Sequence, residues 1–324
     1  MPRIRIWLAR AAKMFLLLLV LAAASLYLLY FHRPALPAAP PHTRVAPVFA
    51  PVSGMSACWV ETGKTFTRFP FAFTAGSILV RHPAGDLLLD TGNSSHFYEE
   101  IRGLSFRRRL KLNLLVAQLN PETPLPDLLR RIGEDPGKIR WVIPSHSHLD
   151  HVGGLMDLPE IPVLMTREEA EFAADPETQA MGYVIAQHAR KLPPPAAATL
   201  RFTPQPYEIF DESADLFGDG SVVLVPLRGH TPGSVGIFVN LAPGRRFFYV
   251  GDSVDDERGF LERVGKSLML QSSDNDPARA NAIVATLNQL HTLLPDLAII
   301  PAHGRSAYRK LFPAGPLSCI SAPK

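Results

Sequence analysis

Three histidines and one aspartate occur within six residues, at the end of a short apolar run. Residues 145–154 read Ser-His-Ser-His-Leu-Asp-His-Val-Gly-Gly and follow the apolar residues 141–143. Imidazole nitrogens and carboxylate oxygens are ligands that zinc takes at about 2.0–2.2 Å. Side chains two residues apart share one side of an extended segment, so His146 and His148 can bind one ion together. Asp150 and His151 fall in the following turn, where they can face a second ion.

Three other predicted strands also end in a potential ligand. His230 lies in a Gly/Pro-rich turn after residues 221–226, Asp252 ends the run 247–250, and His303 follows the run 297–300. One such residue alone would be an ordinary polar loop residue. Four strand ends that together supply five histidines and two aspartates favour a metal cluster instead.

These motifs resemble those of the metallo-β-lactamase-fold hydrolase superfamily, over about residues 54–312. The series includes Leu88-Leu89-Asp90-Thr91-Gly92 and, in order after it, the histidine motif, Gly229-His230, Gly251-Asp252 and Ala302-His303-Gly304. The resemblance implies an α/β (α+β) fold, a four-layer αβ/βα sandwich with a dinuclear zinc site at one edge of its two sheets.

The resemblance also implies a role for each residue of this site. One ion would be held by three histidines, namely His146, His148 and His230. The other would be held by Asp150, His151 and His303. Asp252 would bridge the two ions, and Asp90 would lie behind the ligands and orient one of them.

The implied cofactor is two Zn²⁺ per chain, with another divalent metal as the alternative. Two ions a few Å apart lower the pKa of a shared water, which gives a bridging hydroxide that attacks a carbonyl carbon. Asp150 would serve as a ligand and also as a proton shuttle to the leaving group. The site therefore predicts hydrolysis of a small-molecule substrate without a serine or cysteine nucleophile.

Two ligand positions narrow the branch of the superfamily. A histidine at 148, where the redox di-iron branch has a glutamate, argues against that branch, and Asp252 argues against true β-lactamases. The order and spacing look most like lactonase-like members, which include acyl-homoserine lactonases, so we expect cleavage of a lactone, ester or thioester. Alternatives are a phosphodiester hydrolase on the same metals and a non-catalytic, ligand-binding member of the fold.

One position departs from the lactonase pattern. Those enzymes typically carry a tyrosine three residues after the bridging aspartate, and this chain has Asp255 there. Tyr183, Tyr207 and Tyr249 are candidates to take over its contact with substrate.

The elements that must position these residues are short strands and helices in alternation. Residues 77–80 and 87–89 flank a turn at 82–86 and predict a hairpin. Strands are predicted at 140–143, 221–226, 235–239, 247–250 and 297–300, and helices at 127–132 and 278–294. Strands in two groups, each followed by helices, favour a layered sheet fold. Phe66, Phe69, Phe71 and Phe73 alternate as in a strand and are expected in the core.

The N-terminus has a different character. Residues 14–31 contain Ser25 as the one clearly polar residue and span roughly 27 Å as a helix, near the thickness of a bilayer. Basic residues precede them, which predicts a cytoplasmic N-terminus at 1–13 and a single-pass anchor at 14–31, with the catalytic domain outside the cytoplasm, periplasmic if bacterial. A cleaved signal peptide with a site near Ala22-Ala23-Ala24 is the alternative. Six prolines at 32–55 predict an extended linker that holds the domain off the membrane, before the domain at 56–312 and a tail at 313–324.

Composition sets the remaining limits. The 324 residues are 47% hydrophobic, which excludes disorder, and two cysteines are too few for a disulfide scaffold. Cys58 and Cys319 would either pair outside the cytoplasm or remain buried thiols. A net charge of +3, from 33 basic and 30 acidic residues, indicates no nucleic-acid partner. The basic, partly apolar segment 99–119 would be a solvated helix face over the core, a lipid-contacting helix or a lid over the metals. The oligomeric state does not follow from the sequence.

Overall fold

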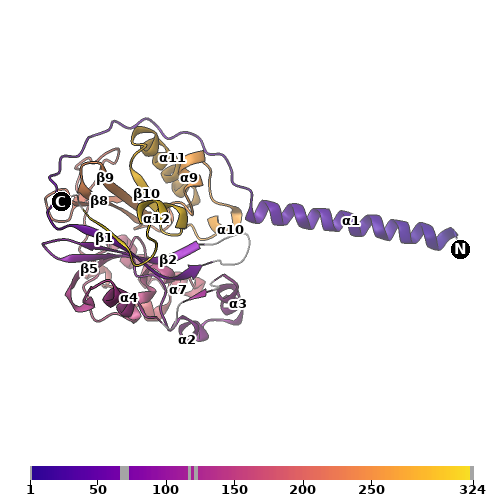
Figure 1. Ribbon diagram of the computed structural model, residues 1–324. Helices are drawn as coiled ribbons and strands as arrows, with labels where there is room; N and C mark the ends of the chain where they lie inside the picture. The colour runs from indigo at the N-terminus through magenta and orange to yellow at the C-terminus, as the bar shows by residue number, and fades with distance from the viewer. Residues whose placement is uncertain (1, 66–72, 116–117, 120–122, 322–324) are drawn as a thin grey trace.

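Two β-sheets pack face to face in the computed structural model, and helices cover the outer face of each sheet (Figure 1). The structure describes residues 2–65, 73–115, 118–119 and 123–321. Strands of the first sheet follow the order β11-β1-β2-β3-β5, with β4 paired to β1, and those of the second the order β10-β9-β8-β7-β6. The predicted αβ/βα sandwich is confirmed.

The first sheet contains the N-terminal strands of the domain and one C-terminal strand. Its members are β1 (Ser56–Thr65), β2 (Phe73–Arg81), β3 (Asp86–Leu89), β4 (Gln118–Leu119), β5 (Ile139–Ile143) and β11 (Cys319–Ser321). The second sheet consists of β6 (Ala214–Asp215), β7 (Val222–Pro226), β8 (Val235–Ala242), β9 (Arg245–Gly251) and β10 (Ala298–Pro301). The predicted hairpin is present, because β2 and β3 pair antiparallel.

The helices are mostly short. They are α1 (Pro2–Tyr30), α2 (Phe97–Glu100), α3 (Phe106–Leu115), α4 (Leu125–Arg131), α5 (Leu149–Val152), α6 (Arg167–Ala174), α7 (Pro176–Met181), α8 (Ala186–Ala189), α9 (Arg258–Glu262), α10 (Leu268–Gln271), α11 (Pro277–Leu293) and α12 (Arg305–Leu311). The predicted helices at 127–132 and 278–294 correspond to α4 and α11.

Alternation along the strands creates three layers of core. In β2, Ile78 and Val80 face the second sheet, whereas Leu79 faces the opposite way, toward the cluster that includes α4 and α6. In β8, Phe238 likewise belongs to the cluster that α11 covers. Each sheet is therefore buried on both faces, which explains the continuous apolar runs in strands such as β3 and β7.

Parallel pairing places the chemistry at one edge of the sandwich. β3 pairs parallel with β5 in the first sheet, and β9 pairs parallel with β10 in the second. The carboxyl ends of parallel neighbours lie at the same edge of a sheet. Asp90 is thereby brought next to Ser145, and Gly251 next to Pro301.

Cys58 on β1 and Cys319 on β11 form a disulfide, a pairing that the sequence alone left open. The bond joins the first strand of the domain to its last, across 261 residues. Such a bond restricts the unfolded chain and persists in oxidising compartments.

Helix α1 projects away from the domain (Figure 1). Residues Arg10–Tyr30 are long and apolar enough to cross a membrane, a span that begins four residues before the predicted one. Residues 32–55, which the sequence predicts to be a linker, contain no helix and contact the domain. In the first part of this segment, the Leu36 amide donates to the Arg263 carbonyl, and the Gly265 amide donates to the Pro34 carbonyl. Helix α1 contacts α10. Phe66, Phe69 and Phe71 lie outside the described residues.

Candidate metal centre

The predicted ligands converge at the edge where the strands of both sheets end. His146 and His148 follow β5, His230 follows β7, Asp252 follows β9 and His303 follows β10. Asp150 and His151 lie on the short helix α5. All seven side chains predicted from the sequence therefore meet in one place, although they span more than 150 residues of the chain.

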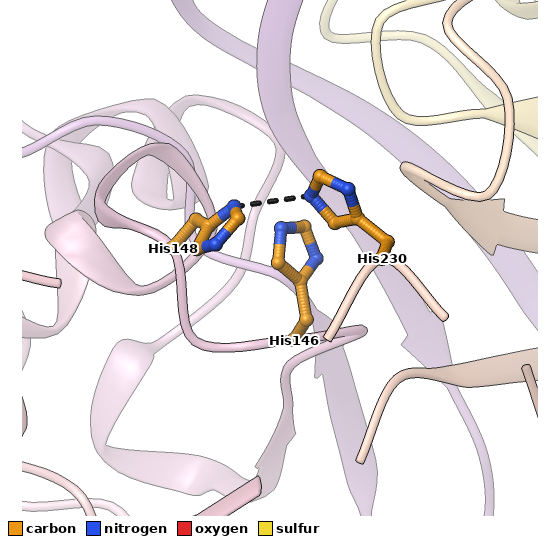
Figure 2. Close-up of side chains that lie close together, drawn as sticks. All are labelled: His146, His148 and His230. Atoms are coloured by element: carbon orange, nitrogen blue, oxygen red, sulfur yellow. Dashed lines mark hydrogen bonds between the residues drawn. The ribbon is translucent and has the colours of Figure 1, made fainter. Parts of the chain in front are cut away.

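Three imidazoles form the first group. One ring nitrogen from each of His146, His148 and His230 lies within 4.8 Å of the other two (Figure 2). Nδ1 of His148 is 3.0 Å from Nε2 of His230. The three rings point inward to a common centre, with a geometry suited to one small cation.

Asp150, His151 and His303 form the second group, again with ligand atoms within 4.8 Å of one another. Nε2 of His303 is 3.5 Å from an Asp150 oxygen, and Nε2 of His151 is 3.8 Å from the other. The five imidazoles are at most 9% exposed, whereas the Asp150 and Asp252 side chains are 16% and 15% exposed.

Asp252 lies between the two groups. Its oxygens are 3.2 Å from Nε2 of His303 and 3.4 Å from Nε2 of His151. They are also 3.6 Å and 4.0 Å from Nε2 of His230 and His146. A carboxylate in this position can contact two ions at once.

Unpaired polar atoms at the centre fit a metal. Nε2 of His146, Nε2 of His151 and Oδ1 of Asp252 are buried and have no hydrogen-bond partner among the described residues. Buried polar groups are normally paired, so atoms of this kind that face one point call for a ligand. Nitrogen and carboxylate oxygen donors suit zinc.

The far side of most rings is held by a hydrogen-bond acceptor. Nδ1 of His151 bonds to Asp90 and Nδ1 of His230 to Asp274, both at 2.7 Å. Nδ1 of His303 bonds to the Thr74 carbonyl, also at 2.7 Å. Such partners fix the ring orientation and leave Nε2 directed at the centre.

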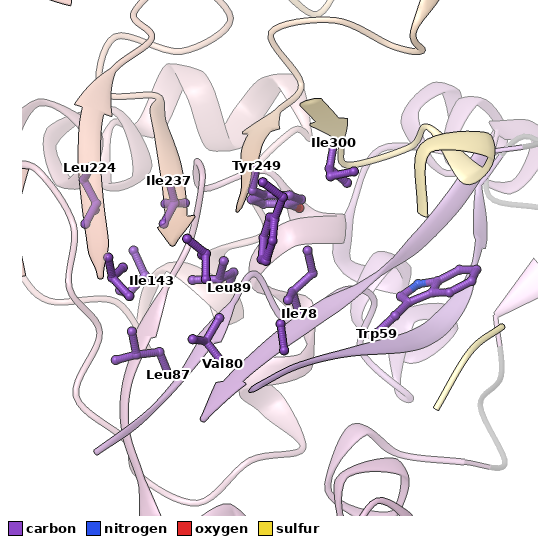
Figure 3. Packing of buried hydrophobic residues seen from close by; sticks show 14 of the residues in the cluster. Trp59, Ile78, Val80, Leu87, Leu89, Ile143, Leu224, Ile237, Tyr249 and Ile300 are labelled. Carbon is purple, nitrogen blue, oxygen red and sulfur yellow. The ribbon is translucent and has the colours of Figure 1, made fainter. Parts of the chain in front are cut away.

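Asp90 combines several of these contacts. It adopts a left-handed backbone with φ of 53°, which is uncommon for a residue other than glycine. Its carboxylate accepts from the Ser145 amide and hydroxyl as well as from His151. The hydroxyl of Tyr249 donates to it from the core between the sheets, at 2.5 Å (Figure 3). Asp90 therefore links the candidate metal centre, through His151, to the core between the sheets, through Tyr249.

Gly229 sets the path of the chain into His230. Its φ is +152°, and a Cβ atom there would lie 2.5 Å from the Ala280 amide at the start of α11. A side chain at this position would push the His230 turn away from α11.

Sequence reasoning missed three buried charged residues around the centre. Glu169 on α6 accepts from the amide and hydroxyl of Ser147 and from Thr231, and Asp274 holds His230. Lys266 donates to Asp274 at 2.6 Å. No local spacing marks these residues, because each reaches its partner through the tertiary fold.

Burial and neighbouring charges divide the imidazoles into two electrostatic classes. Burial and adjacent imidazoles hold the pKa values of His146 and His148 well below the ordinary value. Burial alone would lower the pKa of His303 too, but Asp252 and Asp150 raise it to about 9. Burial would raise the pKa of Asp252, and His303 and His151 outweigh it and hold that pKa well below its usual range. The first group thus offers neutral imidazoles beside an ionised carboxylate, the forms that bind metal, whereas His303 must release a proton when metal binds.

The three candidate tyrosines lie in different places. The Tyr183 ring stacks on His148 with 5.2 Å between centroids, and its hydroxyl donates to the Ser272 carbonyl. The hydroxyl of Tyr249 is bonded behind the site to Asp90, and that of Tyr207 contacts Asn240 and Arg246 on the second sheet. Tyr183 is the one of the three whose ring packs against a predicted metal ligand.

A two-sheet sandwich with this histidine-rich edge defines the class, and the chain belongs to the metallo-beta-lactamase superfamily. The model of that family matches residues 74–299.

Curated relatives include lactonases. The chain is 28% identical over 163 residues to the N-acyl homoserine lactonase AttM of Rhizobium radiobacter, a match that covers 50% of this chain and 58% of that protein. It thus matches somewhat more than half the length of that lactonase. A probable metallo-hydrolase of Mycobacterium tuberculosis is 27% identical over 257 residues, with 76% of this chain and 79% of that protein covered.

Solved structures show the same fold. An N-acyl homoserine lactone hydrolase, with the product N-hexanoyl-L-homoserine at its catalytic metal centre, superposes with a TM-score of 0.58 and 17% identity. The match covers 79% of this chain and 95% of that one.

Proposed function

We propose that this protein is a membrane-anchored, di-zinc hydrolase that cleaves an ester-like bond in a lactone, ester or thioester. The observation that carries the proposal is the convergence of seven side chains at one centre, where Nε2 of His146, Nε2 of His151 and Oδ1 of Asp252 are buried and have no hydrogen-bond partner among the described residues. The lactonase relatives support an ester-like substrate and favour a lactone among the three.

The distances suggest which atom each ligand would use. His146 and His230 would bind one zinc ion through Nε2, and His148 would bind it through Nδ1, the nitrogen that faces His230. Asp150 and the Nε2 atoms of His151 and His303 would bind the second ion. Asp252, which is near both groups, would bridge them.

The bound zinc ions would supply Lewis acidity toward a carbonyl oxygen and would bring the pKa of a water molecule toward neutrality. The chain's own residues hold the geometry. Asp90, Asp274 and the Thr74 carbonyl lock three imidazoles, so the site needs little reorganisation when substrate binds. Asp150 has an exposed edge and lies beside His303, a position from which it would pass a proton to the leaving group.

The location of the domain belongs to the same proposal. Arg10–Tyr30 would anchor the chain in a membrane, with the basic N-terminus in the cytoplasm and the catalytic domain outside it. The Cys58–Cys319 disulfide supports an oxidising compartment for the domain. N-terminal sequencing of the membrane-extracted protein separates the anchor from a cleaved signal peptide, because cleavage would remove residues before about 25.

The hydrolase proposal is tested with the full chain in detergent or nanodiscs. Zinc content is measured, and turnover is screened on lactones, p-nitrophenyl esters, thioesters and bis-p-nitrophenyl phosphate. We expect two zinc ions per chain and turnover of at least one ester-like substrate. The variant His148→Ala should lose metal, and its turnover should fall by more than the roughly 10–100-fold that loss of an outer partner costs. His96→Ala, at a histidine whose side chain is 62% exposed, is the matched control.

Two results would contradict the proposal. Turnover of the phosphodiester alone would assign a phosphodiesterase to the same metals. A zinc-loaded protein that is inert to every substrate class would indicate a non-catalytic binding protein.

A further inference from the structure

A group of apolar and basic side chains lies on α2, on α3 and on the turn between them, outside the metal centre, and all of them except Ile101 reach the surface. Tyr98, Phe106 and Leu110 are 43%, 70% and 48% exposed. With Ile101, Arg102 and Arg109 they line a shallow cavity of about 330 Å³. We call these six residues the α2–α3 patch.

The exposed residues of the patch are not needed to fill the hydrophobic core beneath them. The buried side of the same segment is already satisfied, because Phe97, Ile101 and Leu112 pack with Leu149 and Ile185 in a separate cluster. Phe106 and Leu110 are four residues apart and share one face of α3. Two large apolar side chains that lie side by side and exposed to solvent, with arginines around them, indicate a surface that binds a partner.

The charged residues of the patch are all basic. Arg102 and Arg109 lie within it, and Arg107 and Arg108 lie between them along the chain. None of these four arginines forms an ion pair with a described residue. Unpaired guanidinium groups beside aromatic and aliphatic side chains match the interface of an anionic bilayer, where phosphates meet hydrocarbon.

A series of contacts leads from Arg108, which precedes the patch residue Arg109 on α3, to α1. Arg108 lies against Gly182, where a Cβ atom would be 3.3 Å from its Nη1. The neighbouring Tyr183 donates to the carbonyl of Ser272, at the end of α10. Helix α10 in turn contacts α1, and α3 and α10 lie on the side of the domain from which α1 projects (Figure 1).

Arg33 holds the base of α1 to the domain. Its guanidinium pairs with Asp255 and Asp256 at 2.8 Å, just after Asp252. These ion pairs hold residue 33, three residues after the end of α1, against the domain. Tyr183, whose hydroxyl reaches the end of α10, also stacks on His148, so the metal centre lies close to this link.

We propose that the α2–α3 patch binds the surface of the anionic phospholipid bilayer in which α1 is inserted, and that this contact holds the metal centre close to the bilayer interface. The proposal rests on the membrane insertion of α1 proposed above. Amphiphilic ester-like substrates that partition into the bilayer would then reach the centre without leaving the interface.

Hydrogen–deuterium exchange of the full chain tests this contact. The protein is placed in nanodiscs of phosphatidylcholine, in nanodiscs that also contain phosphatidylglycerol, and in neutral detergent micelles. We expect peptides that cover Phe97–Leu110 to exchange more slowly in phosphatidylglycerol nanodiscs than in the other two. Arg102→Gln with Arg109→Gln should weaken this protection by roughly fivefold for each arginine removed. Phe106→Ser with Leu110→Ser should abolish it.

Arg130→Gln with Arg131→Gln on α4 is the matched control, since it removes the same charge from exposed arginines at a distance from α1 (Figure 1). Equal thermal unfolding of all variants in micelles shows that each is folded. Equal exchange in all three environments, or protection that the patch variants retain, would overturn the proposal while the anchor and the hydrolase stand. Failure of the wild-type protein to float with liposomes would instead overturn the insertion of α1 and, with it, this contact.

Discussion

Glu169 and Thr231 are joined by a hydrogen bond of 2.5 Å between the carboxylate and the hydroxyl, although 62 residues separate them. The same carboxylate accepts from Ser147 N at 2.7 Å and from the Gly233 amide at 3.1 Å. Ser147 lies between His146 and His148, and Thr231 follows His230. One buried side chain thus braces both turns that carry the first group of ligands.

Replacement of Glu169 should therefore weaken metal binding. Burial raises the pKa of this carboxyl, and four donors stabilise its acceptor role. An amide in Glu169→Gln turns one acceptor into a donor that faces other donors. We expect zinc affinity to fall about 10–100-fold, the usual effect of a lost outer partner. Competition with a chromogenic chelator measures it, and Glu171→Gln, exposed on the same helix, should have wild-type affinity. Unchanged affinity in Glu169→Gln would show that the brace is dispensable.

The disulfide should contribute to stability through the unfolded state. Cys58 and Cys319 close a loop of 261 residues, and removal of such a link typically costs about 2–4 kcal/mol. The double variant Cys58→Ser with Cys319→Ser should unfold at a lower denaturant concentration than wild type. Reduced wild-type protein should match the variant. A variant as stable as the oxidised protein would contradict this expectation.

Arg33 should fix the linker to the domain. Its ion pair with Asp255 is between side chains that are 10% and 9% exposed. Removal of the guanidinium in Arg33→Ala should cost about 1.5–3 kcal/mol, the range for hydrogen bonds to charged groups. Lys266 also stabilises the Asp255 carboxylate, so the domain itself should remain folded.

Limited proteolysis in the linker at 32–55 is the measurement. Arg33→Ala should be cut faster than wild type. Arg44 lies farther along the linker, is 36% exposed and pairs with Glu208 of the domain. The control variant Arg44→Ala should therefore leave cleavage near residue 33 unchanged. Equal cleavage of wild type and Arg33→Ala would mean that other contacts hold the segment.

The pair of Glu100 and His188 should make stability depend on pH in acid. Burial alone would raise the pKa of Glu100, but the hydrogen bond and charge of His188, 2.8 Å away, hold it below the usual value of 4.5. A carboxyl whose pKa is lower in the folded state stabilises the fold above the unfolded value and loses this contribution as the pH falls through the folded value.

Thermal unfolding of Glu100→Gln should therefore differ most from wild type near neutral pH. The difference should shrink as the pH falls from 4.5 through the lower folded-state pKa, because Glu100 of the wild type is then protonated in the folded as well as the unfolded state. The exposed neighbour Glu99→Gln should unfold like wild type throughout. A difference of equal size at acid and neutral pH would contradict a role for the charge.

The layers of the fold and the candidate metal ligands could be predicted from the sequence. Apolar runs such as 221–226 and 247–250 predict buried strands, and the spacing of His146, His148, Asp150 and His151 predicts a metal site. These signals are local, because side-chain direction repeats every two residues in a strand and ligand types are read one by one.

The residues that support that site became apparent from the three-dimensional fold. Glu169 and Asp274 lie 62 and 44 residues from the side chains they hold, and nothing in local periodicity couples such positions. Other contacts also join residues that are distant in the chain. They are the parallel pairing of β3 with β5 and of β9 with β10, the Cys58–Cys319 disulfide and the ion pair of Arg33 with Asp255. Which of these residues become partners depends on how the two sheets pack as a whole, and no short stretch of sequence encodes that packing.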